Sequence, residues 1–256
     1  MQNIYNEEEL EQLEEDEHSL TEEALLIFLA LMSNAHSVIE DELRSFYQTY
    51  GKDGVVTYAE ARKWISNKDR RRRLNVLLFS IFSEFDMAHC ETEIEFRQML
   101  KKVSTLESKF FGVEIDFDKL RLNWGFDNLD WVDRLDKDVR KWTKVIQADV
   151  KRGILQRKRL NDILSDLDAR FKSIESVLET LSTSETTAVG SIARHEILNE
   201  LGIKEYKFYT RDDEQTCEIC GPMHGKVFPM SAYEVGVTAS PMHPRCRCWE
   251  VPIKQE

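Results

Sequence analysis

The chain has 256 residues, of which 41% are apolar and 32% are charged, and its formal net charge is −12. This composition is ordinary for a globular protein with one large or two modest cores, and it argues against wholesale disorder. The first 23 residues contain ten Asp or Glu and no Lys or Arg, so they carry most of the net charge. The remainder is close to neutral, and overall acidity therefore does not exclude a basic surface elsewhere.

The amino-terminal region predicts neither export nor a membrane span. Residues 1–18 lack the basic start and the apolar stretch of a secretory signal. The longest apolar run, Ala24–Met32, is about half the length that crosses a bilayer, so we interpret it as part of a buried helix. We expect the protein to work in a reducing compartment, where clustered cysteines bind metal more often than they form disulfides.

An acidic tail at residues 1–20 precedes the first predicted helix. Apolar residues between Leu25 and Phe46 follow helical spacing, and Thr21 gives this helix a capped start. Gly51 and Gly54 end it, and a short helix capped by Thr57 follows.

The clearest amphipathic helix comes next. Its apolar residues recur at intervals of three and four, which places them on one face: Leu74, Leu77, Leu78, Ile81, Phe82 and Phe85. A basic run, Lys68–Asn75, opens this helix and is interpreted as a solvated helix start, with contact to nucleic acid as the alternative.

A linker around residues 112–131 leads into three further predicted helices. They span about Asp130–Arg152, Leu160–Leu181 and residues 184–203. After Gly202 the segments 204–210 and 226–230 are short and rich in aromatic and β-branched residues, which predicts strands and turns.

Four of the five cysteines lie in the last forty residues, where they form the pattern C-x2-C-x22-H-x2-C-x-C with one histidine. Thiolate and imidazole are zinc ligands, and two short pairs of them can reach one tetrahedral ion. The candidate ligands are Cys217, Cys220, His243, Cys246 and Cys248.

We favour the first four of these residues. Cys248 is the alternative to His243, because alternate residues of an extended segment point to the same face. Buried cysteines or a redox C-x2-C pair would also explain Cys217 and Cys220, but no βαβ pattern surrounds them. Five candidates for four positions indicate a closed, structural Zn²⁺ site rather than an open catalytic one.

One predicted helix has a basic face. Between Arg134 and Arg159 there are ten Lys or Arg and three Asp or Glu. Such a face suits an acidic partner or the backbone of double-stranded DNA, without sequence specificity. The candidate DNA contacts are Lys137, Arg140, Lys141, Lys144 and Arg152.

The sequence therefore predicts a mostly α fold, with helical amino-terminal and middle regions and a small carboxy-terminal α+β module stapled by zinc. The expected divisions are the acidic tail at 1–20, a helical domain at 21–122, a helical segment at 123–202 and the zinc-binding module at 203–256. No catalytic residues are predicted. His195 with Glu196 lacks the second histidine of a metalloprotease motif, and no phosphate loop or dinucleotide fingerprint occurs.

The segment TCEIC…PMHPRCRC resembles the signature of the Mu protein F-like family, the minor head or head morphogenesis proteins of tailed bacteriophages. The resemblance covers residues from about 124 to 252, and Trp131, Arg134 and Glu185 fall at family positions upstream. The matching signature positions are Asp213, Thr216, Cys217, Cys220, Gly225, Phe228, Pro241, His243, Pro244, Cys246, Arg247 and Cys248.

This resemblance implies a non-enzymatic virion component that lies inside the head near the portal and is made in the host cytoplasm. It implies the portal protein as partner and packaged double-stranded DNA as a second, non-specific one, with no membrane and no small-molecule substrate. We expect residues 21–122 to carry the portal-binding surface. The alternatives are a metal-dependent nuclease or toxin-like enzyme, and a zinc-dependent nucleic-acid-binding module.

Overall fold

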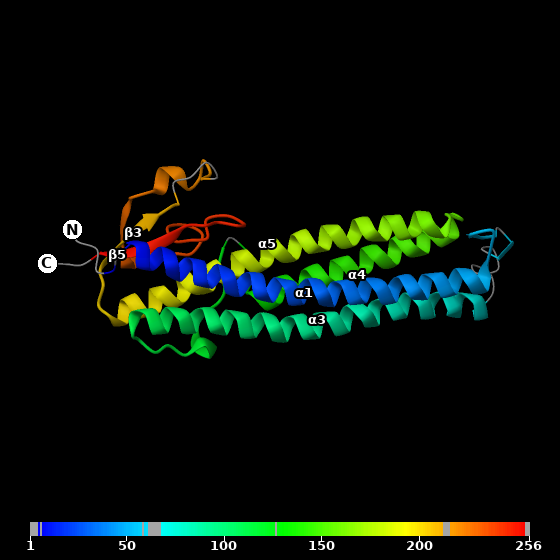
Figure 1. The fold of residues 1–256 in the computed structure, drawn as a ribbon, viewed down its shortest axis with the longest axis horizontal. Coiled ribbons are helices and arrows are strands. Elements are labelled where there is room, and N and C mark those ends of the chain that lie inside the picture. Colours follow the sequence, from blue (N-terminus) through cyan, green and yellow to red (C-terminus); the bar gives the residue numbers. More distant parts are fainter. Residues whose placement is uncertain are drawn as a thin grey trace. The chain divides into compact units, whose positions relative to one another are not determined.

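The computed structural model describes residues 5, 7–57, 59–60, 68–125, 127–211 and 216–253. Most of them lie in four long helices: α1 (Glu7–Tyr50), α3 (Lys68–Phe111), α4 (Trp131–Leu155) and α5 (Leu160–Glu200) (Figure 1). Short strands follow α5. The expected mostly α fold with a small carboxy-terminal strand region is confirmed.

The chain forms two compact units. The sheet unit contains residues Met1–Leu25, Glu95–Arg134 and Glu179–Glu256, and the bundle unit contains Leu26–Ile94 and Leu135–Leu178. Each long helix contributes one part of its length to each unit. The units are therefore interleaved along the chain, unlike the consecutive divisions that we expected from the sequence.

The bundle unit is built from four helical segments that each bury one apolar face. Phe28, Ile39, Ile81 and Phe171 are among its buried residues. Gly153 of α4 lies so close to α5 that a Cβ there would come within 2.8 Å of the Ile163 side chain. The spacing of apolar residues at three and four thus produces a core shared by all four segments.

The length and composition of α1 would allow it to cross a membrane. Helices from the core of globular proteins meet the same two criteria. In the bundle unit its inner face buries Phe28 and Met32, whereas Leu26 is 70% and Ile27 is 42% exposed. The run Ala24–Met32 is thus buried on one face only, which differs from the buried helix that we expected.

The sheet unit contains a three-stranded antiparallel sheet in the order β4–β3–β5. Its strands are β3 (Glu205–Tyr209), β4 (Val227–Pro229) and β5 (Trp249–Ile253). Tyr206 and Trp249 share one core with Leu10 and Leu13 of α1 and Phe111 of α3. The carboxy-terminal strands therefore share a core with α1, α3 and α5. Strand β5 was not anticipated.

The expectation of an acidic tail at residues 1–20 is wrong for the described residues after Tyr5. Residues 7–20 are the first turns of α1. Leu10, Leu13 and Glu17 are buried on one face of these turns, and the buried Thr21 and Ala24 continue that face along α1. The acidic composition obscured this apolar stripe, which has the spacing of a packed helix.

The two helices expected at Leu160–Leu181 and 184–203 are one continuous helix, α5. The segment between them is rich in Ser and Thr, which usually weaken helices. Here their hydroxyls donate to carbonyls one turn back, as in Ser184 Oγ to Thr180 O at 2.7 Å and Thr187 Oγ1 to Thr183 O at 3.1 Å. Small side chains also allow close packing, so the helix continues.

The break after the first helix is confirmed. A hairpin of β1 (Gly51–Lys52) and β2 (Val55–Val56) turns through Asp53 and Gly54, both with positive φ. The short helix expected after Thr57 lies largely outside the described residues. Within them, the Glu60 N–H donates to Thr57 Oγ1 at 3.3 Å, as a helix cap would.

Candidate metal centre

The sheet brings the two cysteine-containing loops to one place. The first loop follows the end of β3, and the second precedes the start of β5. Because Tyr209 at the end of β3 pairs with Trp249 at the start of β5, both loops lie at the same end of the sheet. This register explains how residues more than twenty positions apart in the sequence come together.

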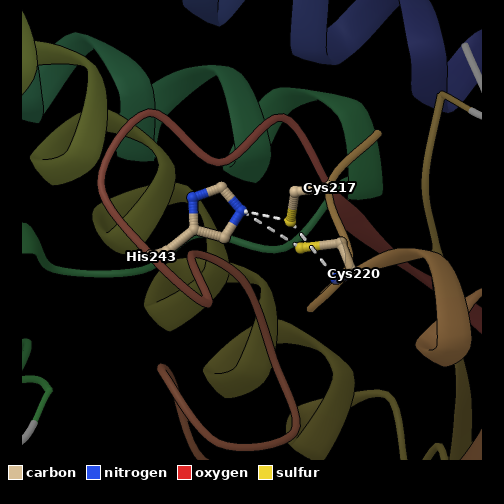
Figure 2. A group of neighbouring side chains, drawn as sticks. All are labelled: Cys217, Cys220 and His243. Carbon is tan, nitrogen blue, oxygen red and sulfur yellow. Dashed lines mark hydrogen bonds between the residues drawn. The ribbon is translucent and has the colours of Figure 1, made fainter. Parts of the chain in front are cut away.

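The candidate ligands are close enough to share one ion. Figure 2 shows that His243 Nε2 points at two sulfurs, 3.1 Å from Cys217 Sγ and 3.3 Å from Cys220 Sγ. Cys220 Sγ is also 3.7 Å from Cys246 Sγ. Two sulfurs bound to one tetrahedral zinc lie about 3.8 Å apart, so this spacing fits such an ion.

Cys220 belongs to two triads of closely spaced donors, one with Cys217 and His243 and the other with Cys246 and Cys248. All five predicted ligands are therefore gathered around Cys220. The choice between His243 and Cys248 as the fourth ligand stays open, because each lies in one of the triads. All five cysteines of the chain are free thiols, including the exposed Cys90.

The three buried thiols of this cluster differ in their pKa. Hydrogen bonds from Cys220 and Cys248 lower the pKa of Cys246 to about 2. The same contacts, together with burial, raise the pKa of Cys220 and of Cys248. Thiolates are the form that binds metal, and a cation is what would allow several of these thiols to ionise together.

Helix α5 fixes the position of the second loop. The Arg245 backbone N–H donates to Ser184 Oγ at 3.2 Å, and the Arg245 side chain pairs with Glu179 at 2.8 Å. Thr187 Oγ1 lies 3.5 Å from the Cys246 carbonyl. These contacts orient the backbone on either side of Cys246, as supporting groups around a metal site commonly do.

Arginines surround the same centre. A small cavity beside the sulfurs and His243 is lined by three of them: Arg211, Arg245 and Arg247. A zinc ion with three or four thiolates carries net negative charge, and adjacent guanidinium groups would offset it. The donor set and its surroundings thus fit a thiolate-rich zinc site.

The five predicted DNA-contact residues lie elsewhere, on α4 in the bundle unit. All of them are exposed, so they do form a basic face. Arg140 pairs with Asp136 at 2.7 Å, and Arg152 pairs with Asp149, so their charge is partly neutralised. Lys137, Lys141 and Lys144 contribute the rest of the face.

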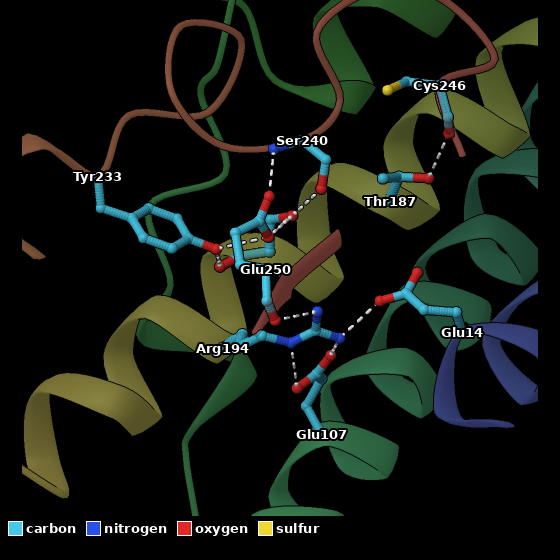
Figure 3. Close-up of polar contacts among 9 residues, drawn as sticks. Glu14, Glu107, Thr187, Arg194, Tyr233, Ser240, Cys246 and Glu250 are labelled. Carbon is cyan, nitrogen blue, oxygen red and sulfur yellow. Dashed lines mark hydrogen bonds and ion pairs between the residues drawn. The ribbon is translucent and has the colours of Figure 1, made fainter. Parts of the chain in front are cut away.

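The sheet unit contains a buried network of charged residues that was not predicted from the sequence (Figure 3). Arg194 of α5 is 1% exposed and donates to Glu14 at 2.7 Å and to both carboxylate oxygens of Glu107. It also donates to the Glu250 carbonyl at 3.3 Å. These partners come from α1, α3 and β5, so one guanidinium joins four elements. In the sequence, Arg194 itself could have indicated this network, because it is a charged residue among the apolar positions of α5.

The network continues through the Glu250 carboxylate. It accepts hydrogen bonds from the Ser240 N–H at 2.6 Å, the Tyr233 hydroxyl at 3.0 Å and the Ser191 hydroxyl at 3.1 Å. Burial raises the pKa of Glu250, although these donors oppose the shift. The loop that leads to the second pair of candidate ligands is thereby tied to β5.

Glu17 lies beside this network and has a carboxylate oxygen, Oε1, without a hydrogen bond among the described residues. It is 2% exposed. Burial raises its pKa well above the ordinary value, and the nearby Glu107 and Glu14 add to the shift. Gly190 leaves room for this carboxyl, since a Cβ there would lie 2.7 Å from Glu17 Oε2.

Glu185, a family position in the sequence analysis, is also buried and paired. Arg134 Nη1 lies 2.6 Å from Glu185 Oε1, and the Trp124 indole donates to Oε2 at 2.9 Å. The Arg134 guanidinium also lies over the Trp124 ring. His195 stacks on Tyr233 instead of facing a nucleophile. These contacts are typical of residues that support a fold.

Comparison with known proteins identifies one family. Residues 144–251 match the family described as Phage Mu protein F like protein. This segment includes about half of α4, from residue 144 onward, and all of α5. It also includes nearly all of the three-stranded sheet and every candidate metal ligand. Neither the curated proteins nor the solved structures give a match. The resemblance found in the sequence is thus confirmed for residues 144–251, which are similar to the Phage Mu protein F like family.

Proposed function

We propose that this protein is a minor head protein of a tailed bacteriophage or prophage, incorporated at the portal and acting in head morphogenesis. The observation that carries the proposal is the family match over residues 144–251, which includes the whole candidate metal centre. The protein would be made in the host cytoplasm and would lie inside the head, near the portal.

Within this function, the metal centre is a structural Zn²⁺ site. Cys220, Cys246 and Cys248 are buried, and they pack with Phe208 of β3. Such a site cross-links the two loops and stabilises the end of the sheet. Five donors around one point favour this closed arrangement over an open catalytic position, and so favour a structural role over the nuclease or toxin-like alternative.

Portal binding is assigned to residues 21–122. Support comes from the exposed apolar residues of this segment, among them Leu26 and Ile27 on the outer side of α1. Exposed apolar side chains that are grouped together commonly mark interfaces. The residues 134–159 supply a separate basic face for non-specific contact with packaged DNA.

Co-expression with the cognate portal protein tests this function. Fragments are unsuitable, because both compact units draw residues from each half of the chain. The full-length chain should co-purify with the portal, and a Leu26→Glu/Ile27→Glu variant should lose most of this association. Val237→Glu is the matched control, since Val237 is 47% exposed but lies outside residues 21–122.

If the Leu26→Glu/Ile27→Glu variant still bound the portal and Val237→Glu did not, the portal surface would lie outside residues 21–122. No association of the wild-type chain with the portal, under conditions where both are folded, would contradict the proposed function itself.

A further inference from the structure

Helix α3 carries a second apolar stripe on the side opposite its core face. Within the bundle unit, Leu74, Leu77, Ile81 and Phe85 are buried. On the outer side Val76 is 63%, Phe79 66%, Met87 56% and Ile94 57% exposed. We call the outer residues Val76, Phe79, Ser83, Met87, Cys90 and Ile94 the outer stripe.

The outer stripe has the spacing of a helix-pairing surface. Its members follow one another at intervals of three, four, four, three and four residues. This pattern keeps them on one face over about five turns, as in the seam of two packed helices. The core of the bundle unit covers only one apolar face of α3. The second apolar face is exposed, and exposed apolar surface of this kind marks an interaction site.

The charges beside the stripe identify the partner. The amino-terminal end of α3 is basic, with exposed Lys68 and Arg71–Arg73. The segment Glu84–Glu95, at the other end of the outer stripe, is acidic, with Glu84, Asp86, Glu91, Glu93 and Glu95. A parallel copy of the same helix would place like charges together at both ends. An antiparallel copy would place basic residues beside acidic ones at both ends, which favours pairing.

We propose that α3 pairs with α3 of a second copy of this chain, antiparallel and centred on Ser83. Phe79 then lies opposite Met87 of the second copy, and Val76 lies opposite its Cys90. Arg73 approaches Glu91 and Glu95 of the second copy, and Arg71 approaches its Glu93. The contact is self-complementary, as a two-fold dimer requires. This dimer goes beyond the proposed function. It uses the outer stripe of α3, whereas the proposed portal contact within residues 21–122 is tested at Leu26 and Ile27 of α1.

Sulfhydryl cross-linking of the full-length chain tests both the pairing and its direction. The central variant is Ser83→Cys in a Cys90→Ser background, and the control is the wild-type chain with its native Cys90. Antiparallel pairing brings the two sulfurs introduced at position 83 together across the two-fold axis. It leaves the two Cys90 residues about 21 Å apart along the helices, because 14 residues rise about 1.5 Å each.

We expect rapid cross-linking of the Ser83→Cys variant through position 83, identified by mass spectrometry, and no Cys90–Cys90 bond in the wild type. In sedimentation experiments the wild-type chain should have twice the mass of one chain, and Val76→Glu/Phe79→Glu should have the mass of one. The variant should keep its helical circular dichroism.

A Cys90–Cys90 bond would show parallel pairing and overturn the proposal. A monomeric wild type without cross-linking at position 83 would also overturn it. If that monomeric chain bound the portal and Val76→Glu/Phe79→Glu abolished the binding, the outer stripe would belong to the portal interface instead. The proposed function would survive that result, so the two failures are distinguishable.

Discussion

Among the described residues, the sheet unit buries five charged side chains and the bundle unit buries none. The five are Glu17, Glu107, Glu185, Arg194 and Glu250, whereas Thr92 and Thr143 are the buried polar residues of the bundle unit. The bundle unit is held by apolar packing, which tolerates volume-conserving changes. The sheet unit depends on specific partners, because a buried charge is costly once its partner is removed.

The difference matches the roles that we propose for the units. Buried hydrogen bonds and ion pairs have strict geometry, so they can hold the two loops of the metal centre in one arrangement. Apolar helix faces can be used both as core and as contact surface, and in the bundle unit α1 and α3 each have buried and exposed apolar residues.

The largest expected effect is that of Arg194→Met. It leaves the buried Glu107 and the partly buried Glu14 without their cation, and we expect a loss of about 3–5 kcal/mol in the free energy of unfolding. Arg140→Met in the bundle unit is the control, because its pair with Asp136 is exposed and should be worth less than about 1 kcal/mol. Denaturant titration of both variants measures the difference. Equal, small losses would show that the buried network is not what stabilises the sheet unit.

A smaller effect is expected from pH. Burial raises the pKa of Glu14 to about 7, against 4.5 ordinarily, and raises that of Glu17 well above its ordinary value. Carboxyl groups with raised pKa favour folding while protonated, so this contribution is complete below about pH 4.5 and is lost as pH rises through 7. Burial is the main cause of the raised pKa of Glu14; among its charged neighbours Arg194 opposes the shift, and Glu107 and Glu250 add to it.

The Glu17→Gln variant tests whether the carboxyl group of Glu17 contributes to this pH dependence of stability. The neutral amide should make the sheet unit more stable than wild type at pH 8, by about 1–3 kcal/mol, and should flatten its pH dependence. Amide exchange in β5 and in the first turns of α1 reports on this unit, and exchange in the bundle unit should not change. Glu22→Gln is the exposed control. A wild type that becomes steadily more stable from pH 5 to 8 would contradict the interpretation.

The smallest effect on stability is expected from the basic face. Replacing Lys137, Lys141 and Lys144 by Gln should change the free energy of unfolding by no more than about 0.5 kcal/mol relative to wild type, because all three are exposed. Binding to duplex DNA should weaken, and its log–log salt slope should fall by about 1 per lost phosphate contact. Lys101→Gln/Lys102→Gln on the sheet-unit part of α3 is the control. Sequence-selective or salt-insensitive binding would mean that this face does not contact the DNA backbone.

Local patterns in the sequence predicted much of this structure. The three-and-four spacing from Leu74 to Phe85 and the break at Gly51 and Gly54 correspond to the observed helix and hairpin. The cysteine spacing placed five candidate ligands in one group, and in the structure all five lie around Cys220, because two short pairs can meet in few ways; that they bind metal stays a prediction. Periodicity and ligand spacing are properties of neighbouring residues, so they can be detected without the fold.

Long-range partners could not be predicted in this way. Arg194 lies 180 residues from Glu14 and 87 from Glu107, and nothing in its own segment identifies them. The start of α1 was missed because ten acidic residues suggested a solvated tail, although Leu10 and Leu13 already had helical spacing. Strand β5 is short and follows the last cysteines directly, so its pairing with β3 became evident only in the fold.

Metal content combined with thiol reactivity tests most directly whether a zinc ion holds the sheet unit together. Purified full-length protein should contain about one zinc per chain. A thiol reagent should modify the exposed Cys90 quickly and the other four cysteines only after chelation or unfolding. Protein without metal, in which all five thiols react in the native state, would contradict the zinc site.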